Sequence, residues 1–528
     1  MLASSASNSV IAGRVSRNDL DATSWRMNTN STHVVVEAAN SWIRIKRTKW
    51  PRLRCAHTEN ELLLSLVPRP ESSALTVSLN AQRMRLVLDS LGAVQVYYYD
   101  DGIALWFANT LGDLIALLPS ADIPELDDEM LVERLARMSS NTDRTLLKGV
   151  FVLAENATLD FRRDGVSLAD SPHSFVSERL NVCSQIVYDD PILEFTRRVK
   201  LAWSDVGLDE AATCNVAASL SGGADSAVIA HSAVALGHMV EPVVLLSMML
   251  GGSQGGHQAI RIQETVQFLK GESVSVQVEQ FPVYRASQFA DVTVHDIDRE
   301  LYWHATEAML DLATSAGVDV LLTGFGGDEL FVEDPGEHVG FQGEQERNRR
   351  STMLRPEWLT EAAWEMLGAS SVPLEKHLLP NIPHSVRRSQ RAYNGLCFRR
   401  GIWPIAILGH PALWMYTRKL PRSWRANKRL LEVHRAQAGF PDSMLNLRIK
   451  DSFGDHYYES LLAVRGHIEM LLDHSVLADR GIVETNAVRD LFVNVIKNGV
   501  SRATNSFMAV LECELFLQSL RRRQQCKI

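Results

Sequence analysis

The chain has 528 residues, of which 46% are hydrophobic and 22% charged, and its formal net charge is −9. The length favours two domains, and the acidic balance argues against general binding to nucleic acid or to an anionic membrane. The six cysteines are scattered without a C-x-x-C pair, which favours reduced thiols over a disulfide framework or a zinc site. No apolar run is long enough to span a membrane, and residues 1–8 lack a signal-peptide pattern, so we expect a cytoplasmic protein.

The first part of the chain alternates short β-type runs with turns. Residues 1–30 are rich in Ser and Asn and are expected to form a loose N-terminus. Residues 31–180 are expected to form an α+β, mostly antiparallel domain. The sequence Asp100-Asp101-Gly102 is a hairpin signal. The pattern predicts many short strands, for example at 33–37, 84–88, 94–99 and 103–107, helices at 111–118 and 129–138, and two more strands within 144–161.

After residue 189, predicted helices and strands alternate, which is typical of an α/β fold with a doubly wound parallel sheet. Ligands of such sheets bind at the carboxyl ends of the strands. From about residue 358 onward the pattern is helical, so residues 190–528 are interpreted as one α/β domain with a helical extension. Strands are predicted at 213–220, 242–247, 274–278 and 319–323, and helices at 191–204, after 225, at 257–269 and at 300–316.

Residues 220–226 read Leu-Ser-Gly-Gly-Ala-Asp-Ser and join a predicted strand to a predicted helix. Glycines let backbone N–H groups close around a phosphate, and the helix N-terminus adds partial positive charge. Asp225 would repel phosphate unless a metal ion lay between them, so the motif predicts a nucleotide bound with Mg²⁺. No Walker A sequence occurs in the chain. The alternative interpretation is a glycine-rich turn that arose by chance.

A second glycine-rich loop follows the strand predicted at 319–323 and reads Gly-Phe-Gly-Gly-Asp over residues 324–328. In a parallel sheet this loop faces the first one across the strand ends. Asp225 and Asp328 are therefore expected to hold Mg²⁺ against the phosphates of ATP. The alternative role for Asp328 is that of a helix N-cap.

These motifs resemble those of the asparagine synthetase family, ATP pyrophosphatases whose members include β-lactam synthetases, carbapenam synthetases and lasso peptide cyclases. The resemblance implies ATP and Mg²⁺ as cofactors and Asp225 and Asp328 as metal ligands. A late Arg-x-Lys matches Arg448 and Lys450, which the resemblance makes catalytic; the alternatives are an ion pair for the arginine and a surface position for the lysine. The expected ATP-binding residues are Leu220, Ser221, Gly222, Gly223, Asp225, Ser226, Ser247, Met248, Thr323, Gly324, Gly326 and Gly327.

The N-terminal half is similar to the glutaminase domain of the same family over residues 89–118 and 145–153. Glutamine-dependent members need a cysteine directly after the initiator methionine, and this chain has Leu2 there. Residues 31–180 are therefore expected to form an inactive, degenerate glutamine amidotransferase-like domain. Asparagine synthetases carry Glu at the position of Phe325 and Ser or Ala at that of Gly327, and the Gly-x-Gly-Gly-Asp form is most like that of lasso peptide cyclases.

The resemblance makes residues 190–528 an asparagine synthetase-like, ATP-dependent cyclase domain. The expected enzyme is an AMP-forming lasso peptide macrolactam synthetase, which adenylates an Asp or Glu side chain of a ribosomal precursor peptide and joins it to the N-terminal amine. Expected partners are that precursor peptide, a leader-recognition protein and a leader peptidase of the same pathway, with no nucleic acid and no membrane. The alternatives are an ammonia-dependent asparagine synthetase, a β-lactam-type synthetase, or a scaffold that retains a nucleotide site.

Aromatic residues are frequent between residues 332 and 425. They either line a cavity for a peptide or belong to the core of a helical domain, and the second interpretation is favoured. The residues in question are Trp358, Trp364, Trp403, Trp414, Trp424, Phe341 and Phe398.

Overall fold

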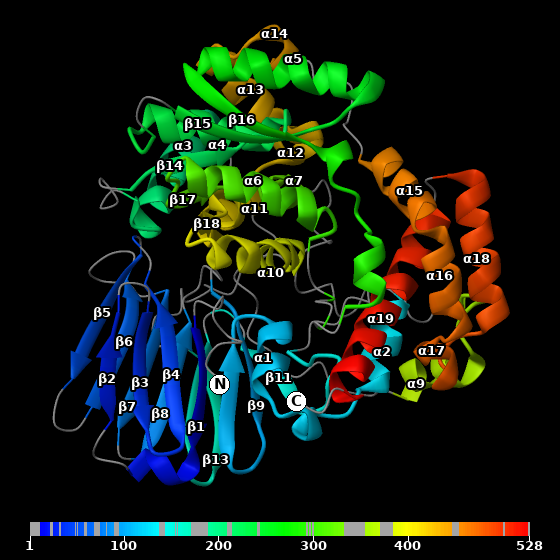
Figure 1. The fold of residues 1–528 in the computed structure, drawn as a ribbon. Helices are drawn as coiled ribbons and strands as arrows, with labels where there is room; N and C mark the ends of the chain where they lie inside the picture. Colours follow the sequence, from blue (N-terminus) through cyan, green and yellow to red (C-terminus); the bar gives the residue numbers. More distant parts are fainter. Residues whose placement is uncertain are drawn as a thin grey trace.

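The structure is a computed structural model with an antiparallel N-terminal part, a parallel sheet flanked by helices, and further helices that pack beside both (Figure 1). In the described part of the chain, no helix has both the length and the apolar character needed to cross a membrane. The structure describes residues 11–21, 25–30, 33–47, 49, 51–57, 61–67, 74–80, 82–88, 94–136, 143–153, 155, 157–170, 188–208, 214–239, 243–291, 294, 297, 300–331, 354–369, 384–445, 453–499 and 502–525.

The N-terminal part consists of two antiparallel sheets whose inward side chains share one hydrophobic core. The first sheet, in spatial order, comprises β11 (Val150–Leu153), β9 (Val96–Asp100), β10 (Ala104–Ala108), β1 (Ile11–Ser16), β4 (Ser41–Lys46), β3 (His33–Ala38) and β2 (Arg26–Thr29). The second comprises β13 (Gly165–Asp170), β12 (Ala157–Arg162), β8 (Arg83–Leu88), β7 (Leu75–Asn80), β6 (Glu61–Val67) and β5 (Arg52–His57).

Strand β10 shows how the first sheet is buried on both faces. Leu105 and Phe107 point into the core between the sheets, whereas Trp106 and Ala108 belong to a second core on the opposite face. That second core includes side chains of α1 (Leu111–Leu117) and α2 (Asp128–Leu135), so both predicted helices are confirmed. The predicted hairpin is also confirmed, because β9 and β10 pair directly across Gly102, which has a φ of +85°.

The expectation of a loose segment over residues 1–30 is wrong for the described residues from Ile11 onward. Strand β1 lies between β10 and β4, and the side chains of Ile11 and Val15 are fully buried. The first strand is anchored further by the Ile11 N–H, which donates to Asn109 Oδ1 at 2.6 Å. The sequence signal was weak because small or polar residues separate the two large apolar ones. Residues 1–10 lie outside the described residues.

The C-terminal part contains a sheet in which all neighbouring strands are parallel, as predicted. Strand β18 was not predicted; it has only three residues, includes Pro404, and lies at the edge of the sheet, where a residue without an N–H group is tolerated. The strands, in spatial order, are β16 (Gly271–Gln277), β15 (Val243–Met249), β14 (Val216–Ser219), β17 (Val320–Leu322) and β18 (Trp403–Ile405).

Helices cover this sheet and extend beyond it. Those that accompany the sheet are α3 (Pro191–Asp205), α4 (Ala224–Ala235), α5 (Gly252–Phe268), α6 (Trp303–Ser315), α10 (His384–Arg399), α11 (Pro411–Lys419) and α13 (Arg429–Ala438). Short helices are α7 (Gly327–Leu330), α12 (Arg422–Arg425), α14 (Asp442–Leu445), α17 (Val476–Asp479), η2 (Arg17–Asp21), η3 (Ser120–Asp122), η5 (Val278–Gln280), η6 (Ala286–Phe289), η8 (Ile407–Gly409) and η9 (Ala426–Lys428).

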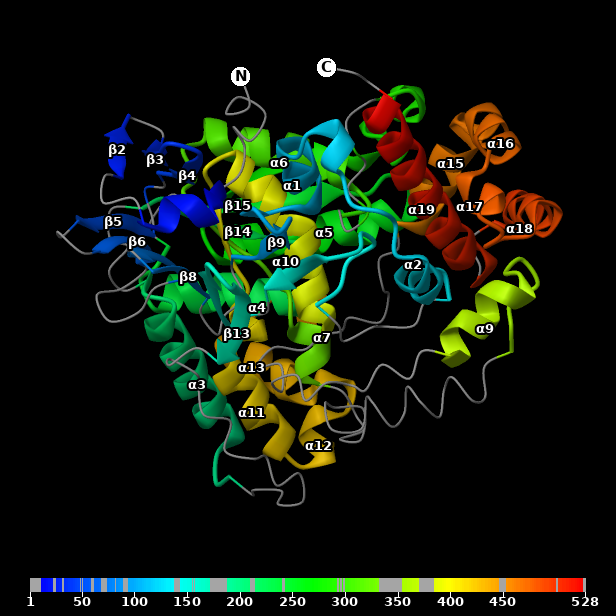
Figure 2. The same cartoon turned by 90° about the horizontal axis from the view of Figure 1, so that it is seen from below.

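The remaining helices form a layer at one side of the molecule, and its long last helix returns to the N-terminal part (Figure 1). Figure 2 also places α19 beside α2, and Arg523 Nη2 of α19 donates to the carbonyl oxygen of Ala116 at 3.4 Å. This contact is one junction between the two halves of the chain. These helices are α9 (Glu361–Ala369), α15 (Gly454–Ala463), α16 (Arg465–Asp473), α18 (Thr485–Asn498) and α19 (Arg502–Gln525).

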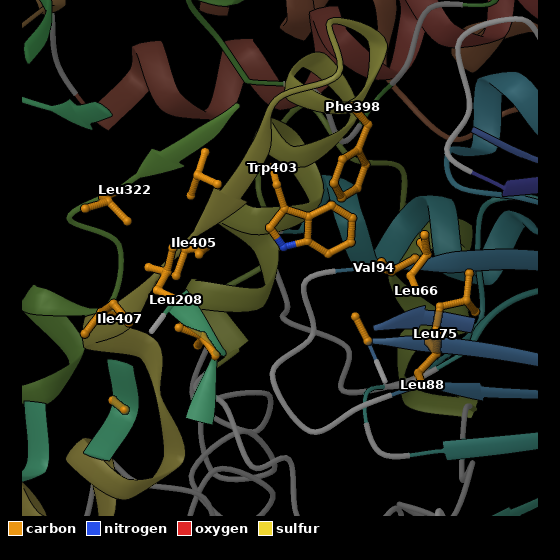
Figure 3. Close-up of a cluster of buried hydrophobic side chains, with 14 of the residues drawn as sticks. Leu66, Leu75, Leu88, Val94, Leu208, Leu322, Phe398, Trp403, Ile405 and Ile407 are labelled. Carbon is orange, nitrogen blue, oxygen red and sulfur yellow. The ribbon is translucent and has the colours of Figure 1, made fainter. Parts of the chain in front are cut away.

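A second junction is a buried hydrophobic cluster between the parallel sheet and the antiparallel sheets, centred on Trp403 (Figure 3). The rings of Trp403 and Phe398 lie 5.1 Å apart, between Leu322 on one side and Leu88 on the other. The interpretation of the late aromatic residues as core is confirmed for the described ones. Trp358, Trp403, Trp414 and Phe398 are buried, Trp364 and Trp424 are partly buried, and Phe341 lies outside the described residues.

We predict that Trp403→Ala destabilises the protein by about 3–5 kcal/mol, because it removes a large buried side chain and leaves a cavity between the two halves. The free energy of unfolding, measured by denaturant titration, tests this. Leu354→Ala is the control, because 90% of the Leu354 side chain is exposed. Equal stability of both variants would contradict the role of this cluster.

Candidate functional site

The first glycine-rich loop joins β14 to α4 at the carboxyl end of the parallel sheet. Gly222 has a φ of +80°, a conformation that favours glycine. The loop carbonyls are used by the protein itself: Arg261 Nε donates to Gly222 O at 2.8 Å, and Gln258 Nε2 donates to Ser221 O at 3.1 Å. By contrast, no side chain caps the N-terminus of α4. Within the loop, the N–H groups of Ser221 and Gly223 donate to the hydroxyls of Ser226 and Ser221 at 3.2 and 3.3 Å. The N-terminus of α4 is therefore the part of this loop that suits an anion.

The second glycine-rich loop joins β17 to α7 and touches the first. A Cβ atom on Gly324 would lie 3.0 Å from the backbone nitrogen of Ser226, and one on Gly327 would lie 2.1 Å from Asp225 Cγ. Only residues without a side chain allow the two loops to approach this closely. Gly326, with a φ of +99°, occupies the N-cap position of α7, so Asp328 lies in the first turn and is not the N-cap.

Lys428 joins the two loops electrostatically. Its Nζ lies 2.6 Å from Asp225 Oδ2 and 2.6 Å from Asp328 Oδ1. One ammonium group thus compensates both carboxylates that the sequence predicted to meet. Sequence reasoning assigned no role to Lys428, because a lysine just before an amphipathic helix resembles an ordinary solvated residue. The available signal was its place in the run Asn427-Lys428-Arg429, which precedes the Arg-x-Lys motif along the chain.

The backbone that presents Lys428 is strained. Asn427 and Lys428 have φ values of +53° and +56°, in the left-handed region that side chains rarely adopt. Two consecutive residues of this kind cost free energy and persist only where their surroundings hold them. Here the ion pairs with Asp225 and Asp328 hold the lysine, which directs its side chain back over α4.

In this cluster, burial and the neighbouring charges shift the pKa values of Asp225 and Lys428 in opposite directions. Burial raises the pKa of Asp225, and the positive charges of Lys428 and Arg435 only partly offset that effect. Burial lowers the pKa of Lys428, but the charge of Asp225 and the hydrogen bonds to both aspartates outweigh it, so the net shift is upward. The lysine therefore stays protonated at neutral pH, and Asp225 is a carboxylate that gains from a nearby cation.

The residues present fit a nucleotide with a divalent cation. Asp225 Oδ1 is buried and has no hydrogen-bond partner among the described residues, and the same holds for Ser247 Oγ. A buried oxygen without a hydrogen-bond partner lowers stability unless a bound ligand supplies that partner. No group of three or more His, Cys, Asp or Glu side chains suited to a metal ion occurs in the described ranges. Asp225 and Asp328 would therefore hold Mg²⁺ only together with phosphate and water oxygens, the usual arrangement for this ion.

The predicted ATP-binding residues occupy three neighbouring strand ends. Leu220 donates its N–H to Leu246 O at 2.7 Å, which ties the first loop to β15, the strand that ends in Ser247 and Met248. Gln258 Nε2 donates to Met248 O at 3.1 Å as well as to Ser221 O, so it joins the same two segments. Sequence reasoning missed this glutamine and Arg261, which a search for polar side chains on the helix after β15 would have found.

Of the other predicted site residues, Ser226 and Thr323 are described by the structure, whereas the two predicted catalytic residues are not. Ser226 Oγ lies 3.2 Å from Ser221 Oγ, and Thr323 is buried at the end of β17, where its N–H donates to Ile405 O at 2.9 Å. The predicted catalytic residues Arg448 and Lys450 lie outside the described residues, so their roles stay predictions.

A doubly wound parallel sheet with two glycine loops and paired aspartates at its carboxyl edge defines an ATP pyrophosphatase type of domain. Residues 211–400 match the family described as asparagine synthase, so the chain contains an asparagine synthase domain. This family consists of ATP-dependent ligases, which indicates ATP-dependent amide chemistry for the domain. Lys428 lies beyond the matched residues.

Two further comparisons add little. A search of curated proteins finds no match. Among solved structures, the U34-tRNA thiolase NcsA from Methanococcus maripaludis with its [4Fe-4S] cluster is similar over 53% of this chain and 79% of its own, with 13% identity and a TM-score of 0.25. A similarity this low carries no argument about fold or function.

We predict that Gly327→Ala abolishes ATP binding and destabilises the protein by about 1–3 kcal/mol, because the new methyl group would overlap the Asp225 carboxylate. Calorimetric titration with ATP and thermal unfolding test both effects. Gly466→Ala in α16 is the matched control, since its Cβ meets nothing within 4 Å and alanine is the better helix former. Normal ATP binding by the Gly327 variant would disprove contact between the loops.

We predict that Lys428→Met lowers stability by roughly 1–3 kcal/mol, between the values for exposed and buried ion pairs, because both aspartates lose their cation. Added Mg²⁺ should raise the melting temperature of this variant more than that of the wild type, since the two carboxylates are then free to bind it. Lys49→Met is the control, because Lys49 pairs with Asp319 while half exposed. An equal response of all three proteins to Mg²⁺ would contradict a metal role for the two aspartates.

Proposed function

We propose that this protein is an ATP-dependent macrolactam synthetase of the lasso peptide cyclase type. It activates an Asp or Glu side chain of a ribosomal precursor peptide as an acyl-adenylate and joins it to the N-terminal amine of the same peptide. The products are the cyclic peptide, AMP and pyrophosphate. The proposal builds on the asparagine synthase domain over residues 211–400 and on the resemblance of the second loop to that of lasso peptide cyclases.

The observation that carries the choice of substrate is the chemistry of the second loop. Phe325 places an apolar ring where asparagine synthetases carry a glutamate, and this ring packs edge-on against Tyr393 with centroids 5.4 Å apart. An apolar side chain at this position favours a large organic substrate over ammonium or free aspartate. Gly327 leaves no room for the Ser or Ala of asparagine synthetases, because Asp225 fills the space of a side chain.

In the first step, an oxygen of the substrate carboxylate attacks the α-phosphorus of ATP, and the bond to pyrophosphate breaks. Backbone N–H groups of Ser221, Gly222 and Gly223 bind the leaving pyrophosphate, together with the charge of Lys428. Asp225 and Asp328 would hold Mg²⁺, which supplies positive charge to the phosphates when bound. A fixed array of donors and cations of this kind stabilises the charge that develops during the transfer.

In the second step, the N-terminal amine attacks the activated carbonyl, the new C–N bond forms, and AMP leaves. Holding both ends of one peptide together makes this step intramolecular, a large advantage over reaction with a free amine. The resemblance assigns stabilisation of the α-phosphate or of the oxyanion to Lys450 and a phosphate contact to Arg448. It also implies a leader-recognition protein and a leader peptidase, which would deliver a peptide with a free N-terminus.

We predict that the protein, with ATP and Mg²⁺, removes one water from a suitable peptide and forms AMP. Suitable probes are synthetic peptides with a free N-terminal amine and one Asp or Glu at successive distances from it, and any candidate precursor encoded beside this chain, with its leader peptidase and recognition protein. Mass spectrometry detects the loss of water, and fragmentation locates the linked acid. Asp225→Asn is the negative control, because it removes the charge that holds Mg²⁺ with little change of shape.

A parallel reaction contains ATP, aspartate and ammonium. Formation of asparagine there, without cyclisation of any peptide, would contradict the proposed substrate and make the protein an ammonia-dependent asparagine synthetase. Absence of ATP–pyrophosphate exchange with every acyl probe would contradict the proposed chemistry itself.

A further inference from the structure

Beneath the second loop lies a buried tyrosine that the steps above do not use. Tyr393 of α10 packs its ring against Phe325, and only 5% of the residue is exposed. Its hydroxyl has no hydrogen-bond partner among the described residues. A buried hydroxyl without a partner lowers stability, so its presence calls for an explanation. A phenylalanine would pack equally well there without that cost.

A carboxylate, that of Glu300, lies near enough to Tyr393 for its charge to act on the tyrosine. Glu300 precedes α6, and its N–H donates to the carbonyl oxygen of Ala392, the residue before Tyr393, at 3.3 Å. Glu300 Oε2 accepts the hydroxyl of Thr306 at 3.2 Å, and that hydroxyl also lies 3.6 Å from Met248 Sδ. Glu300 therefore connects α10 to the end of β15, where Ser247 and Met248 are expected to bind the nucleotide.

Glu300 lies at the edge of the sheet where ligands of such folds bind. It lies at the N-terminal end of α6, which leads into β17, so it belongs to the carboxyl edge of the parallel sheet. Its side chain is half-buried, neither sealed in the core nor free in solvent. Thr306, which donates to Glu300, also contacts Met248, and Tyr393, on which the charge of Glu300 acts, contacts Phe325 of the second loop.

The two side chains have complementary proton chemistry. Burial raises the pKa of Tyr393 well above its ordinary value, and the charges of Cys397 and Glu300 add to this. The phenol therefore keeps its proton and serves as a donor, whereas a carboxylate serves as an acceptor. Tyr393 is thus a donor that lacks a partner among the described residues, and it lies near an acceptor, Glu300, at the carboxyl edge of the sheet. Such a pair can become ordered when substrate binds.

We propose that Glu300 is the general base of the amide-forming step and that Tyr393 is the residue that positions its carboxylate. This proposal rests on the proposed function. It assigns the base of this step to Glu300, because the Phe325 side chain has no group that can accept a proton. The amine nitrogen attacks the acyl carbon of the adenylate and the C–N bond forms. The C–O bond to the phosphate breaks, AMP leaves with the electron pair, and the proton of the amine passes to Glu300.

The test separates the two half-reactions with Glu300→Gln, which keeps the shape of the side chain and removes its basicity. ATP–pyrophosphate exchange, driven by the peptide or amino acid that supports it in the wild type, should be unchanged. Amide formation should fall by about 10²-fold or more. Hydroxylamine, a nucleophile that needs no base, should still trap the adenylate as a hydroxamate. Glu307→Gln in α6 is the matched control, since Glu307 pairs with Arg400 at 3.7 Å and its substitution should leave both half-reactions unchanged.

Tyr393→Phe tests the positioning role. No hydrogen bond is lost, so the melting temperature should stay the same or rise, while amide formation falls by about tenfold with exchange retained. Tyr416→Phe is the matched control: its hydroxyl donates to Pro191 O at 2.6 Å, so this variant should melt at a lower temperature and retain both half-reactions.

Amide formation by Glu300→Gln at the wild-type rate would overturn the proposal. Loss of exchange together with amide formation would also overturn it, since the residue would then serve the nucleotide site or the fold. If the wild type itself shows no exchange with any acyl probe, the proposed function fails and this proposal falls with it. That outcome is distinct from the other two, in which the wild type is active.

Discussion

The bridge from Lys428 to Asp225 and Asp328 is the interaction on which the site depends. Two carboxylates at neighbouring strand ends repel one another unless a cation lies between them, and one ammonium group 2.6 Å from each supplies that cation. The same arrangement suits a phosphate and its metal ion, because the lysine then meets negative charge and the aspartates meet positive charge. The strained backbone at Asn427 and Lys428 is consistent with a residue placed for a ligand rather than for stability alone.

The rest of the fold brings this cluster together. Parallel strands β14, β15 and β17 end at one edge, and glycines at positions 324 and 327 allow the loops that follow β14 and β17 to touch. The core around Trp403 fixes β18 and the C-terminal end of α10 against the antiparallel sheets. Because α10 also carries Tyr393, the N-terminal half supports one wall of the candidate site.

Much of this was predictable, and the exceptions share a cause. Hydrophobic periodicity located the alternating strands and helices of the second half, and glycine loops at predicted strand ends located the edge where Asp225 and Asp328 meet. Lys428 was not found because its partner Asp225 lies 203 residues away, and nothing local marks such a pair. Strands β1 and β18 were not predicted, because small residues in β1 and Pro404 in β18 weaken the strand pattern. Tertiary packing stabilises both strands. Arg448, Lys450 and the domain boundaries stay predictions.

The central claim is that a substrate carboxylate attacks the α-phosphorus of ATP. The most direct test uses an acyl substrate whose carboxylate carries ¹⁸O, with mass analysis of the nucleotide product. Attack at the α-phosphorus transfers one labelled oxygen to AMP when the amide forms, and this is the result we expect. Label in inorganic phosphate, with ADP as the nucleotide product, would contradict the account, because it would mean attack at the γ-phosphorus.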